Sequence, residues 1–343
     1  MNQSIKAKKH SGLIKYLFPY QKKKRINLLF EQRCLFKCKH CHIWKKEDNF
    51  NVVPLKIWLN FLDDVKNLFK KNIEINLGGE GMVLLDEKIF PIISKSKNLG
   101  FYILLNSNGY LINKLILNKL LESGVDKISI SLDFLSGNKH DKQKGIDGCF
   151  NHIINLIKNI ETINQKSKLF FNCVIMKQNL EEIIPLTKWI NSLGFTIGFQ
   201  AIAQPFNSPD EQNWFNKDKF KFLWPGNDLR TYEIIDKLIT LKKKGHKIGN
   251  DISQLESYKF YFKKPNIRLL DRCNVDEVGF HIYADGIVKR CQFKYSLGTI
   301  KDNKFGELLK SNEYITTLNS MYSCSENCMQ MVNCSFKNKP KIY

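Results

Sequence analysis

Apolar and polar positions alternate with two different periods along the first 204 residues. Short apolar runs, typical of buried strands, are separated by stretches in which apolar residues recur every three or four positions, typical of amphipathic helices. The predicted strands are 26–31, 73–77, 101–105, 127–132, 169–175 and 197–202, and the predicted helices are 55–70, 87–98, 112–123, 149–163 and 180–193. Six strand-then-helix units predict a parallel sheet with right-handed crossovers, as an open doubly wound sheet or an incomplete barrel.

The rest of the chain has a different pattern. An aromatic loop from Trp214 to Asp228 precedes a predicted helix from Thr231 to Lys244, which Gly245 ends. The last part is rich in cysteine and contains only short elements, so its apolar core is too small to be stable without a metal. We therefore predict four parts: a basic N-terminal extension (1–24), a barrel (25–204), a connector with a helix (205–270) and a cysteine-rich C-terminal subdomain (271–343).

Composition narrows the class of protein. With 343 residues, 43% of them hydrophobic, the chain can form a globular protein of about two domains. The net charge of +21 comes almost entirely from lysine spread over the predicted helices. Nucleic-acid recognition favours arginine for its bidentate geometry, so we expect a solvated surface and no nucleic-acid partner, although the basic segment 22–25 leaves this alternative open. Without a membrane-length apolar run or a signal peptide, we expect a cytoplasmic protein.

Ten cysteines in a cytoplasmic protein favour metal or redox chemistry over disulfides. Cys149 and Cys173 stand apart in apolar surroundings, and we predict that both are buried core residues. Three others, Cys34, Cys38 and Cys41, form a C-x3-C-x2-C pattern directly after the first predicted strand. In barrels of this kind the functional residues cluster at the C-terminal ends of the strands.

These three thiolates can each hold one iron of a [4Fe–4S] cluster and leave the fourth iron open to a small molecule. A zinc site completed by His40 or His42 is the alternative. The spacing resembles that of the radical S-adenosylmethionine (SAM) enzymes. The resemblance implies that SAM chelates the open iron and that the three cysteines are catalytic. Electrons would come from a low-potential donor of the flavodoxin or ferredoxin type.

The resemblance also has consequences for the fold and the reaction. It favours a partial (β/α)6 TIM-like barrel within an α/β fold, followed by a small cysteine-rich α+β iron–sulfur subdomain. One electron from the cluster would cleave SAM to methionine and a 5′-deoxyadenosyl radical, which abstracts hydrogen from a C–H bond. His40, inside the cysteine motif, is then a cofactor-binding residue.

Two further strand ends resemble SAM-binding motifs. Gly78-Gly79-Glu80 follows the second predicted strand, where the superfamily has a GGE motif that binds the SAM amino group. Glycines at a strand end let the backbone approach a ligand, and an ordinary tight turn is the alternative. Gly81 replaces a frequent proline of the motif. The third strand ends in Ser107-Asn108-Gly109, which resembles T-N-G, and both polar residues are predicted to bind the cofactor.

The fourth strand and the residues after it supply the remaining candidates. Ser131-Leu132-Asp133 resembles an S-x-D motif, in which the serine contacts SAM and the aspartate often faces the substrate. Lys144 stands where relatives have an arginine that binds the SAM carboxylate; lysine supplies the charge without the fork geometry, and a surface lysine is the alternative. Asn172 and Gln200, on the fifth and sixth strands, are candidate polar groups inside the barrel.

Five cysteines gather in the C-terminal part. Alternating residues around Asp285-Gly286 predict a β-hairpin. The cysteines around it are Cys273, Cys291, Cys324, Cys328 and Cys334. Their spacing resembles a shortened SPASM/twitch extension, which implies one auxiliary [4Fe–4S] cluster with the first four as favoured ligands and Cys334 as the alternate. A structural zinc is the alternative for soft thiolates in a small subdomain.

We therefore predict a radical SAM enzyme that oxidises or dehydrogenates a small-molecule or carbohydrate-type substrate. Only about 24 residues precede the first strand, whereas the leader-recognition domain of many peptide maturases is a folded unit of about 80 residues. This favours a small molecule over a peptide that acquires a thioether or an epimerised residue. A nucleic-acid modifying enzyme is a third possibility, and a non-catalytic zinc-binding protein is the rival of another class.

Overall fold

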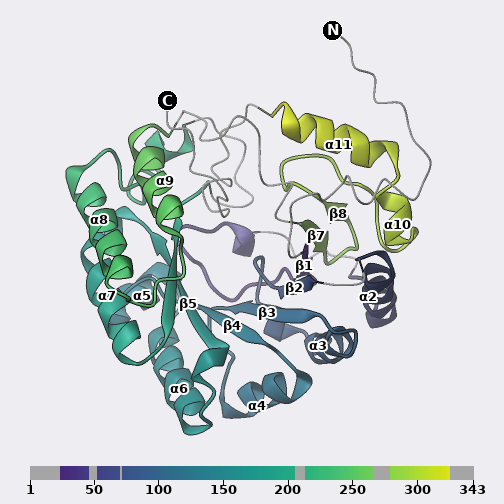
Figure 1. Ribbon diagram of the computed structural model, residues 1–343, viewed down its shortest axis with the longest axis horizontal. Helices are drawn as coiled ribbons and strands as arrows, with labels where there is room; N and C mark the ends of the chain where they lie inside the picture. Colours follow the sequence, from purple (N-terminus) through teal and green to yellow (C-terminus); the bar gives the residue numbers. More distant parts are fainter. Residues whose placement is uncertain (1–23, 46–51, 70–71, 205–212, 266–278, 325–343) are drawn as a thin grey trace.

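The computed structural model describes residues 24–45, 52–69, 72–204, 213–265 and 279–324. In these residues eight strands form one sheet in the order β6-β5-β4-β3-β2-β1-β7-β8 (Figure 1). The strands are β1 (Lys24–Leu29), β2 (Ile73–Leu77), β3 (Tyr102–Ser107), β4 (Lys127–Ser131), β5 (Leu169–Ile175), β6 (Thr196–Ala201), β7 (Phe280–Tyr283) and β8 (Val288–Lys289). The first six are parallel neighbours in chain order, as successive β-then-α units require.

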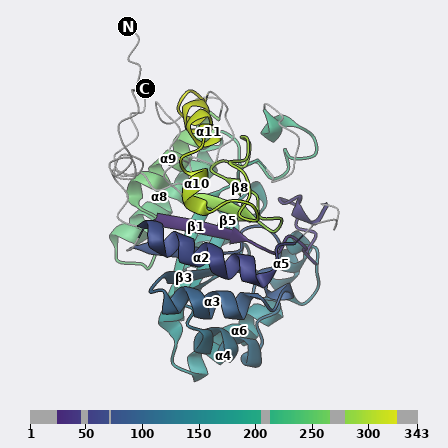
Figure 2. The same cartoon turned by 90° about the vertical axis from the view of Figure 1, so that its right-hand side faces the viewer.

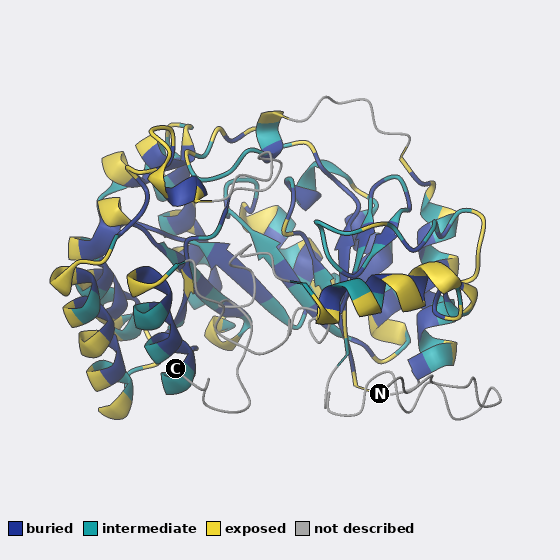
Figure 3. Ribbon diagram, turned by 90° about the horizontal axis from the view of Figure 1, so that it is seen from above, coloured by how far each residue is buried: buried dark blue, intermediate teal, exposed yellow. Residues whose placement is uncertain are grey.

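Helices cover the outer face of this curved sheet (Figures 1 and 2). Between the strands lie α2 (Leu55–Phe69), α3 (Ile89–Asn98), α4 (Lys114–Ser123), α5 (Gly137–Lys144), α6 (Cys149–Thr162) and α7 (Leu180–Ser192). After β6 come α8 (Leu229–Lys243), α9 (Ile252–Lys263), α10 (Phe305–Leu308) and α11 (Asn312–Tyr322). Their exposed residues point away from the sheet, which is itself mostly buried (Figure 3). Among the helices of the described residues, none combines the length and apolar character needed to span a membrane.

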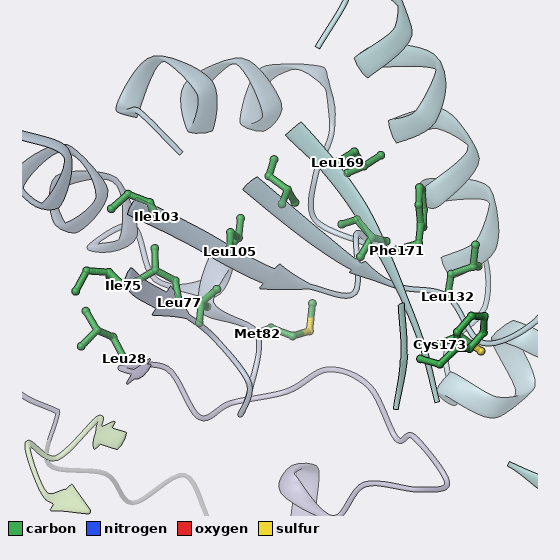
Figure 4. Packing of buried hydrophobic residues seen from close by; sticks show 14 of the residues in the cluster. Leu28, Ile75, Leu77, Met82, Ile103, Leu105, Leu132, Leu169, Phe171 and Cys173 are labelled. Atoms are coloured by element: carbon green, nitrogen blue, oxygen red, sulfur yellow. The ribbon is translucent and has the colours of Figure 1, made fainter. Parts of the chain in front are cut away.

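The face of the sheet that meets the helices is apolar. Leu28, Leu77 and Leu105 are partners in register across β1, β2 and β3, and all three are fully buried (Figure 4). Phe171 and Cys173 continue this layer on β5. Each large apolar side chain buried in this way contributes roughly 1.5–3 kcal/mol to stability. The burial of Cys173, and that of Cys149 on α6, confirms that these two cysteines are core residues.

The opposite face of the sheet carries polar side chains inside the barrel, because strand residues alternate between the two faces. Asn76 Nδ2 donates to Asn27 Oδ1 (2.7 Å), and Asn106 Nδ2 donates to Asn76 Oδ1 (2.5 Å). Farther along the sheet, Asn172 Nδ2 donates to Ser129 Oγ (2.5 Å). This part of the inner face is therefore lined by amides and hydroxyls that hydrogen-bond one another, and toward the start of β1 and β2 it carries the Arg25–Glu74 ion pair (2.6 Å).

The predicted C-terminal hairpin is confirmed, and it extends the barrel sheet. β7 and β8 are antiparallel, and β7 lies parallel beside β1, with Leu28 opposite Ile282. Gly279 makes this approach possible, since a Cβ atom there would lie 1.9 Å from the Arg25 carbonyl oxygen. The hairpin is thus continuous with the first strand of the barrel, an arrangement that the local sequence pattern does not predict.

The free edge of β6 is covered by the connector. Ile248 forms a parallel bridge with Ile197. Asn250 then donates to the Phe199 carbonyl (2.8 Å) and accepts from the Phe199 N–H (2.6 Å) through its side chain. This amide replaces a neighbouring strand and so satisfies the exposed edge.

The predicted α/β partial barrel is confirmed, and each predicted strand and helix is present within a few residues of its predicted bounds. The helices α5, α9, α10 and α11 were not predicted. α5, with the sequence GNKHDKQK, has no apolar period, because its buried residues are polar or charged. The bounds of the four predicted parts stay predictions, and Cys273, Cys328 and Cys334 lie outside the described residues.

Candidate active site

The cysteine loop, residues 33–45, follows the C-terminal end of β1. Cys34, Cys38 and Cys41 are free and partly exposed along it. A turn closes the motif, because the Cys41 N–H donates to the Cys38 carbonyl (3.2 Å). Between the first two cysteines, Phe36 is almost fully buried and meets the ring of Tyr110 edge-on at 5.5 Å. The loop is therefore anchored in the core while its thiols stay near the surface.

The loop that follows β2 holds one side of the cysteine loop. The Met82 N–H donates to the Arg33 carbonyl (2.8 Å). Gly81 has φ +69°, and a Cβ atom there would lie 2.3 Å from the Glu31 carbonyl oxygen. Gly78 makes a similar approach to β3, where a Cβ would lie 2.7 Å from the Asn106 carbonyl oxygen. Glycine is required at both positions, because any side chain would push the two loops apart.

Glu80, between these glycines, is buried near the cysteine loop and near the end of β7. Burial raises the pKa of Cys41 to about 11, and the Glu80 carboxylate adds to this rise. Burial also raises the pKa of Tyr283, and Glu80 raises it further. A carboxylate at this edge of the sheet can bind a ligand ammonium group. The structure thus places Gly78, Gly79 and Glu80 beside the predicted metal-binding thiols.

The thiols suit a metal centre. Burial raises the pKa of Cys38 to about 12, so the free thiol is protonated at neutral pH, and a bound metal would take the place of the proton. In the described ranges, no three Cys, His, Asp or Glu side chains converge on the position of a single metal ion. Three separate soft thiolates fit a multi-iron cluster in which each holds a different iron.

Neither histidine of the loop joins the cysteines. His40 Nδ1 accepts a hydrogen bond from Gln143 Nε2 (2.9 Å), and burial lowers the pKa of His40 to about 4. His42 packs against the ring of Phe220. Gln143, on α5, was not among the predicted site residues. Its Oε1 is buried and has no hydrogen-bond partner within the described structure, as expected of an acceptor that a ligand could fill.

Other predicted cofactor-binding residues lie at the ends of the next strands. Ser107 Oγ accepts from the Gly109 N–H (3.0 Å), and Asn108 Oδ1 accepts from the Tyr110 N–H (3.1 Å). Ser131 is half-buried at the end of β4. These side chains lie at the predicted edge of the barrel, and their cofactor contacts stay predictions.

Asp133 and Lys144, predicted to act separately, form a buried ion pair. Lys144 Nζ lies 2.7 Å from Asp133 Oδ2, and their side chains are 5% and 1% exposed. Burial alone would raise the pKa of Asp133, but the Lys144 cation outweighs it and lowers the pKa to about 2. The alternative of a surface lysine at position 144 is therefore wrong. Lys144 lies on α5, one of the helices that the sequence pattern did not reveal.

Two of the five C-terminal cysteines lie in the described residues. Cys291 follows β8 and Cys324 follows α11, and both are free and partly exposed. Burial raises the pKa of Cys291, and a smaller electrostatic effect of Cys324 adds to this rise, so the two thiols are close enough to interact electrostatically.

Known proteins are similar to this chain in sequence. A family model described as "Radical SAM superfamily" matches residues 29–190. The AdoMet-dependent heme synthase of Methanosarcina barkeri is 31% identical over 155 residues, which span 45% of this chain and 43% of that protein. The tungsten-containing aldehyde ferredoxin oxidoreductase cofactor-modifying protein of Pyrococcus furiosus is 22% identical over 333 residues, or 91% of this chain and 89% of that protein.

Solved structures show the same fold. A structure of anSMEcpe with bound AdoMet has a TM-score of 0.65 at 17% identity and covers 88% of this chain and 84% of that one. SuiB of Streptococcus suis bound to S-adenosylmethionine has a TM-score of 0.66 at 15% identity, with coverages of 91% and 72%. At these identities the likeness concerns the arrangement of strands and helices.

The close approach at Gly81 leads to a stability prediction. Alanine at a positive φ costs about 1–2 kcal/mol by itself, and Gly81→Ala should cost roughly 1–3 kcal/mol more because its Cβ collides with the Glu31 backbone. Gly148→Ala is the matched control, because Gly148 has φ +76° and open space around it. Urea denaturation of the two variants measures the difference, and equal losses of stability would contradict the proposed contact.

Proposed function

Because the chain belongs to the radical SAM superfamily, whose members are enzymes, we propose that it uses SAM to oxidise a small-molecule, carbohydrate-type substrate. Cys34, Cys38 and Cys41 would hold a [4Fe–4S] cluster at the C-terminal edge of the barrel. With SAM bound, this cofactor supplies one-electron reduction and hydrogen abstraction. The observation that carries the proposal is the arrangement of three soft thiols on one anchored loop beside the buried Glu80 carboxylate.

The chain's own groups would bind and orient SAM. The backbone of Gly78 and Gly79 and the carboxylate of Glu80 would receive the SAM ammonium group, since glycine leaves the backbone open to a ligand. The free Oε1 of Gln143, next to His40, is available to a further donor of the ligand. The remaining proposed contacts come from Ser107, Asn108 and Ser131, at the ends of β3 and β4.

The lining of the barrel supports a neutral, hydrogen-bonding substrate. Asn27, Asn76, Asn106 and the Asn172–Ser129 pair present amides and hydroxyls on the inner face of the sheet. Gln200 lies on the inner-facing side of β6, between the buried Phe199 and Ala201. Uncharged groups of this kind match hydroxyl or amide functions better than phosphates. A peptide substrate is the competing proposal, because a peptide backbone presents the same hydrogen-bonding groups.

The neighbouring thiols of Cys291 and Cys324 support an auxiliary cluster. We propose that Cys273 and Cys328 complete its ligands, with Cys334 as the alternate. A cluster with four protein ligands has no open iron and is suited to accepting an electron. Held by these cysteines, the cluster would supply the one-electron acceptor that a net oxidation of the substrate requires.

Radical SAM enzymes need a reductant, and the surface of the cysteine loop suggests its class. Lys37 and Lys39 flank Cys38 and are exposed. Exposed cations beside a redox centre attract an acidic partner and increase its rate of association. We propose a low-potential protein of the flavodoxin or ferredoxin type in the cytoplasm, where thiols stay reduced.

The cluster assignment predicts the iron content. Anaerobically reconstituted protein should hold about eight irons, and the Cys34→Ala/Cys38→Ala/Cys41→Ala variant about four. Cys149→Ala is the control and should retain about eight, because Cys149 is a buried core residue. Iron and zinc analysis provides the measurement. A wild-type content of about four irons, or zinc in place of the second cluster, would rule out the auxiliary cluster.

The position of Glu80 predicts a loss of SAM affinity in Glu80→Ala. A charge-assisted hydrogen bond contributes about 1.5–3 kcal/mol, so the dissociation constant should rise about 10- to 150-fold. Glu87→Ala is the control, since Glu87 is exposed on the same loop. Equilibrium binding to the reconstituted proteins gives both constants. Unchanged SAM affinity in folded Glu80→Ala protein would show that Gly78 to Glu80 form an ordinary tight turn and do not bind SAM.

The type of reaction can be tested with a panel of neutral polyols and amino sugars and a matched panel of peptides. In deuterated buffer with reduced flavodoxin, a polyol should be converted to a product lacking two hydrogens. About one SAM should be consumed per product, and no solvent deuterium should be incorporated.

The Cys334→Ala variant should remain active, because Cys334 is the surplus thiol. Deuterium at an inverted carbon, with activity lost in Cys334→Ala, would indicate epimerisation instead. Turnover of peptides alone would favour a peptide maturase, and turnover with dithionite but not with flavodoxin would contradict the proposed reductant.

A further inference from the structure

The ion pair between Lys144 and Asp133 is the most enclosed in the described part of the chain. It is the one pair there in which both side chains are less than a tenth exposed. Asp133 Oδ1 also accepts from the Val174 N–H (2.9 Å), which fixes the carboxylate to β5. A buried pair is costly to desolvate, and its retention inside a core calls for a role other than stability.

The backbone on either side of Lys144 contacts the backbone on either side of Cys38. The Lys39 N–H donates to the Gln143 carbonyl (3.1 Å). A Cβ atom at Gly145, which has φ +66°, would lie 2.7 Å from the Lys37 carbonyl oxygen. Two neighbours of Cys38 therefore touch two neighbours of Lys144, and the ion pair lies directly behind the cysteine loop.

The two charges of the pair have opposite signs, so they act in opposite directions on the charge of anything held by the cysteine loop.

His140, on α5 beside the pair, adds no charge at neutral pH, because burial lowers its pKa to about 3. The buried thiols of Cys149 and Cys173, whose pKa values burial raises, are also neutral. In the described surroundings of the pair, Lys144 and Asp133 are therefore the fixed charges that act on the cysteine loop from behind.

We propose that the two charges of the Lys144–Asp133 pair, which lie directly behind the cysteine loop, set the reduction potential of the metal centre held there. Reduction adds negative charge to a cluster, so a nearby cation favours the reduced form and a nearby anion opposes it. This assignment rests on the proposed cluster. It differs from the role expected from the resemblance, because the Lys144 ammonium is already neutralised by Asp133 and is not a ligand of the SAM carboxylate.

The test is a redox titration of the reconstituted holoenzyme without SAM, followed by electron paramagnetic resonance. The relevant signal is the one absent from the Cys34→Ala/Cys38→Ala/Cys41→Ala protein. At a fixed ambient potential, Lys144→Met should lower the ratio of reduced to oxidised centre about tenfold, which corresponds to about 59 mV for one electron. Asp133→Asn should raise the same ratio. Shifts of opposite sign distinguish an electrostatic role from a structural one, in which both variants disturb the loop in the same direction.

Two further variants complete the experiment. Lys144→Arg keeps the charge and should keep the wild-type potential even if other variants fold poorly. Lys139→Met removes an exposed cation from the same helix and should leave the potential unchanged. Unchanged potentials in Lys144→Met and Asp133→Asn, or shifts of the same sign in both, would overturn the inference.

SAM affinity, measured on the same proteins, separates the two assignments of Lys144. It should be nearly unchanged in Lys144→Met; a large loss of SAM affinity at an unchanged potential would make Lys144 a SAM ligand and the inference wrong. A wild-type protein that lacks the cysteine-dependent signal would instead overturn the proposed cluster itself.

Discussion

The candidate site depends on close backbone contact between the cysteine loop and two other segments. On one side Gly81 lets the loop after β2 reach the Glu31 carbonyl, and on the other Gly145 lets the end of α5 reach the Lys37 carbonyl. Phe36 is buried between them. Because glycine carries no side chain at these two contacts, three thiols can be held at the edge of the barrel without strain in the loop itself.

The barrel and the C-terminal hairpin share one sheet, and this sharing determines what can lie near the cofactor. β7 continues the sheet beyond β1, and the Asn27 side chain donates to the Phe280 carbonyl (3.0 Å) across the junction. As a result Tyr283 lies close enough to Glu80 for the carboxylate to raise the pKa of the tyrosine, in addition to the larger effect of burial. Parallel strands end at the same edge of a sheet, so the second cysteine region is linked to the predicted SAM site by backbone hydrogen bonds.

Charge inside the protein is limited to places where it is paired. The barrel wall is made of amides, and the histidines near the cysteines are neutral because burial opposes their protonation. Among the ion pairs of the described residues, that of Lys144 and Asp133 has both side chains buried, and each charge is compensated by the other. In such an environment a single buried charge acts strongly, because water does not screen it.

The amino-acid sequence alone predicts the order of strands and helices of the barrel, the position of the cysteine motif at the end of the first strand and the hairpin around Asp285-Gly286. These features depend on local periodicity, spacing and turn chemistry, which a single chain displays directly. The pattern does not predict α5, because its buried residues are His140, Gln143 and Lys144, and a helix whose buried residues are polar shows no apolar periodicity. Its buried position is decided by partners from other elements.

Which polar side chains contact one another depends on how distant segments of the chain pack together in the tertiary structure. The ion pair of Asp133 with Lys144, the contact of Gln143 with His40 and the parallel pairing of β7 with β1 join residues distant in the chain. A lysine or an asparagine has the same local signature whether solvent or another side chain surrounds it. Its partner follows from how the strands and loops pack, and that packing is a property of the whole sheet.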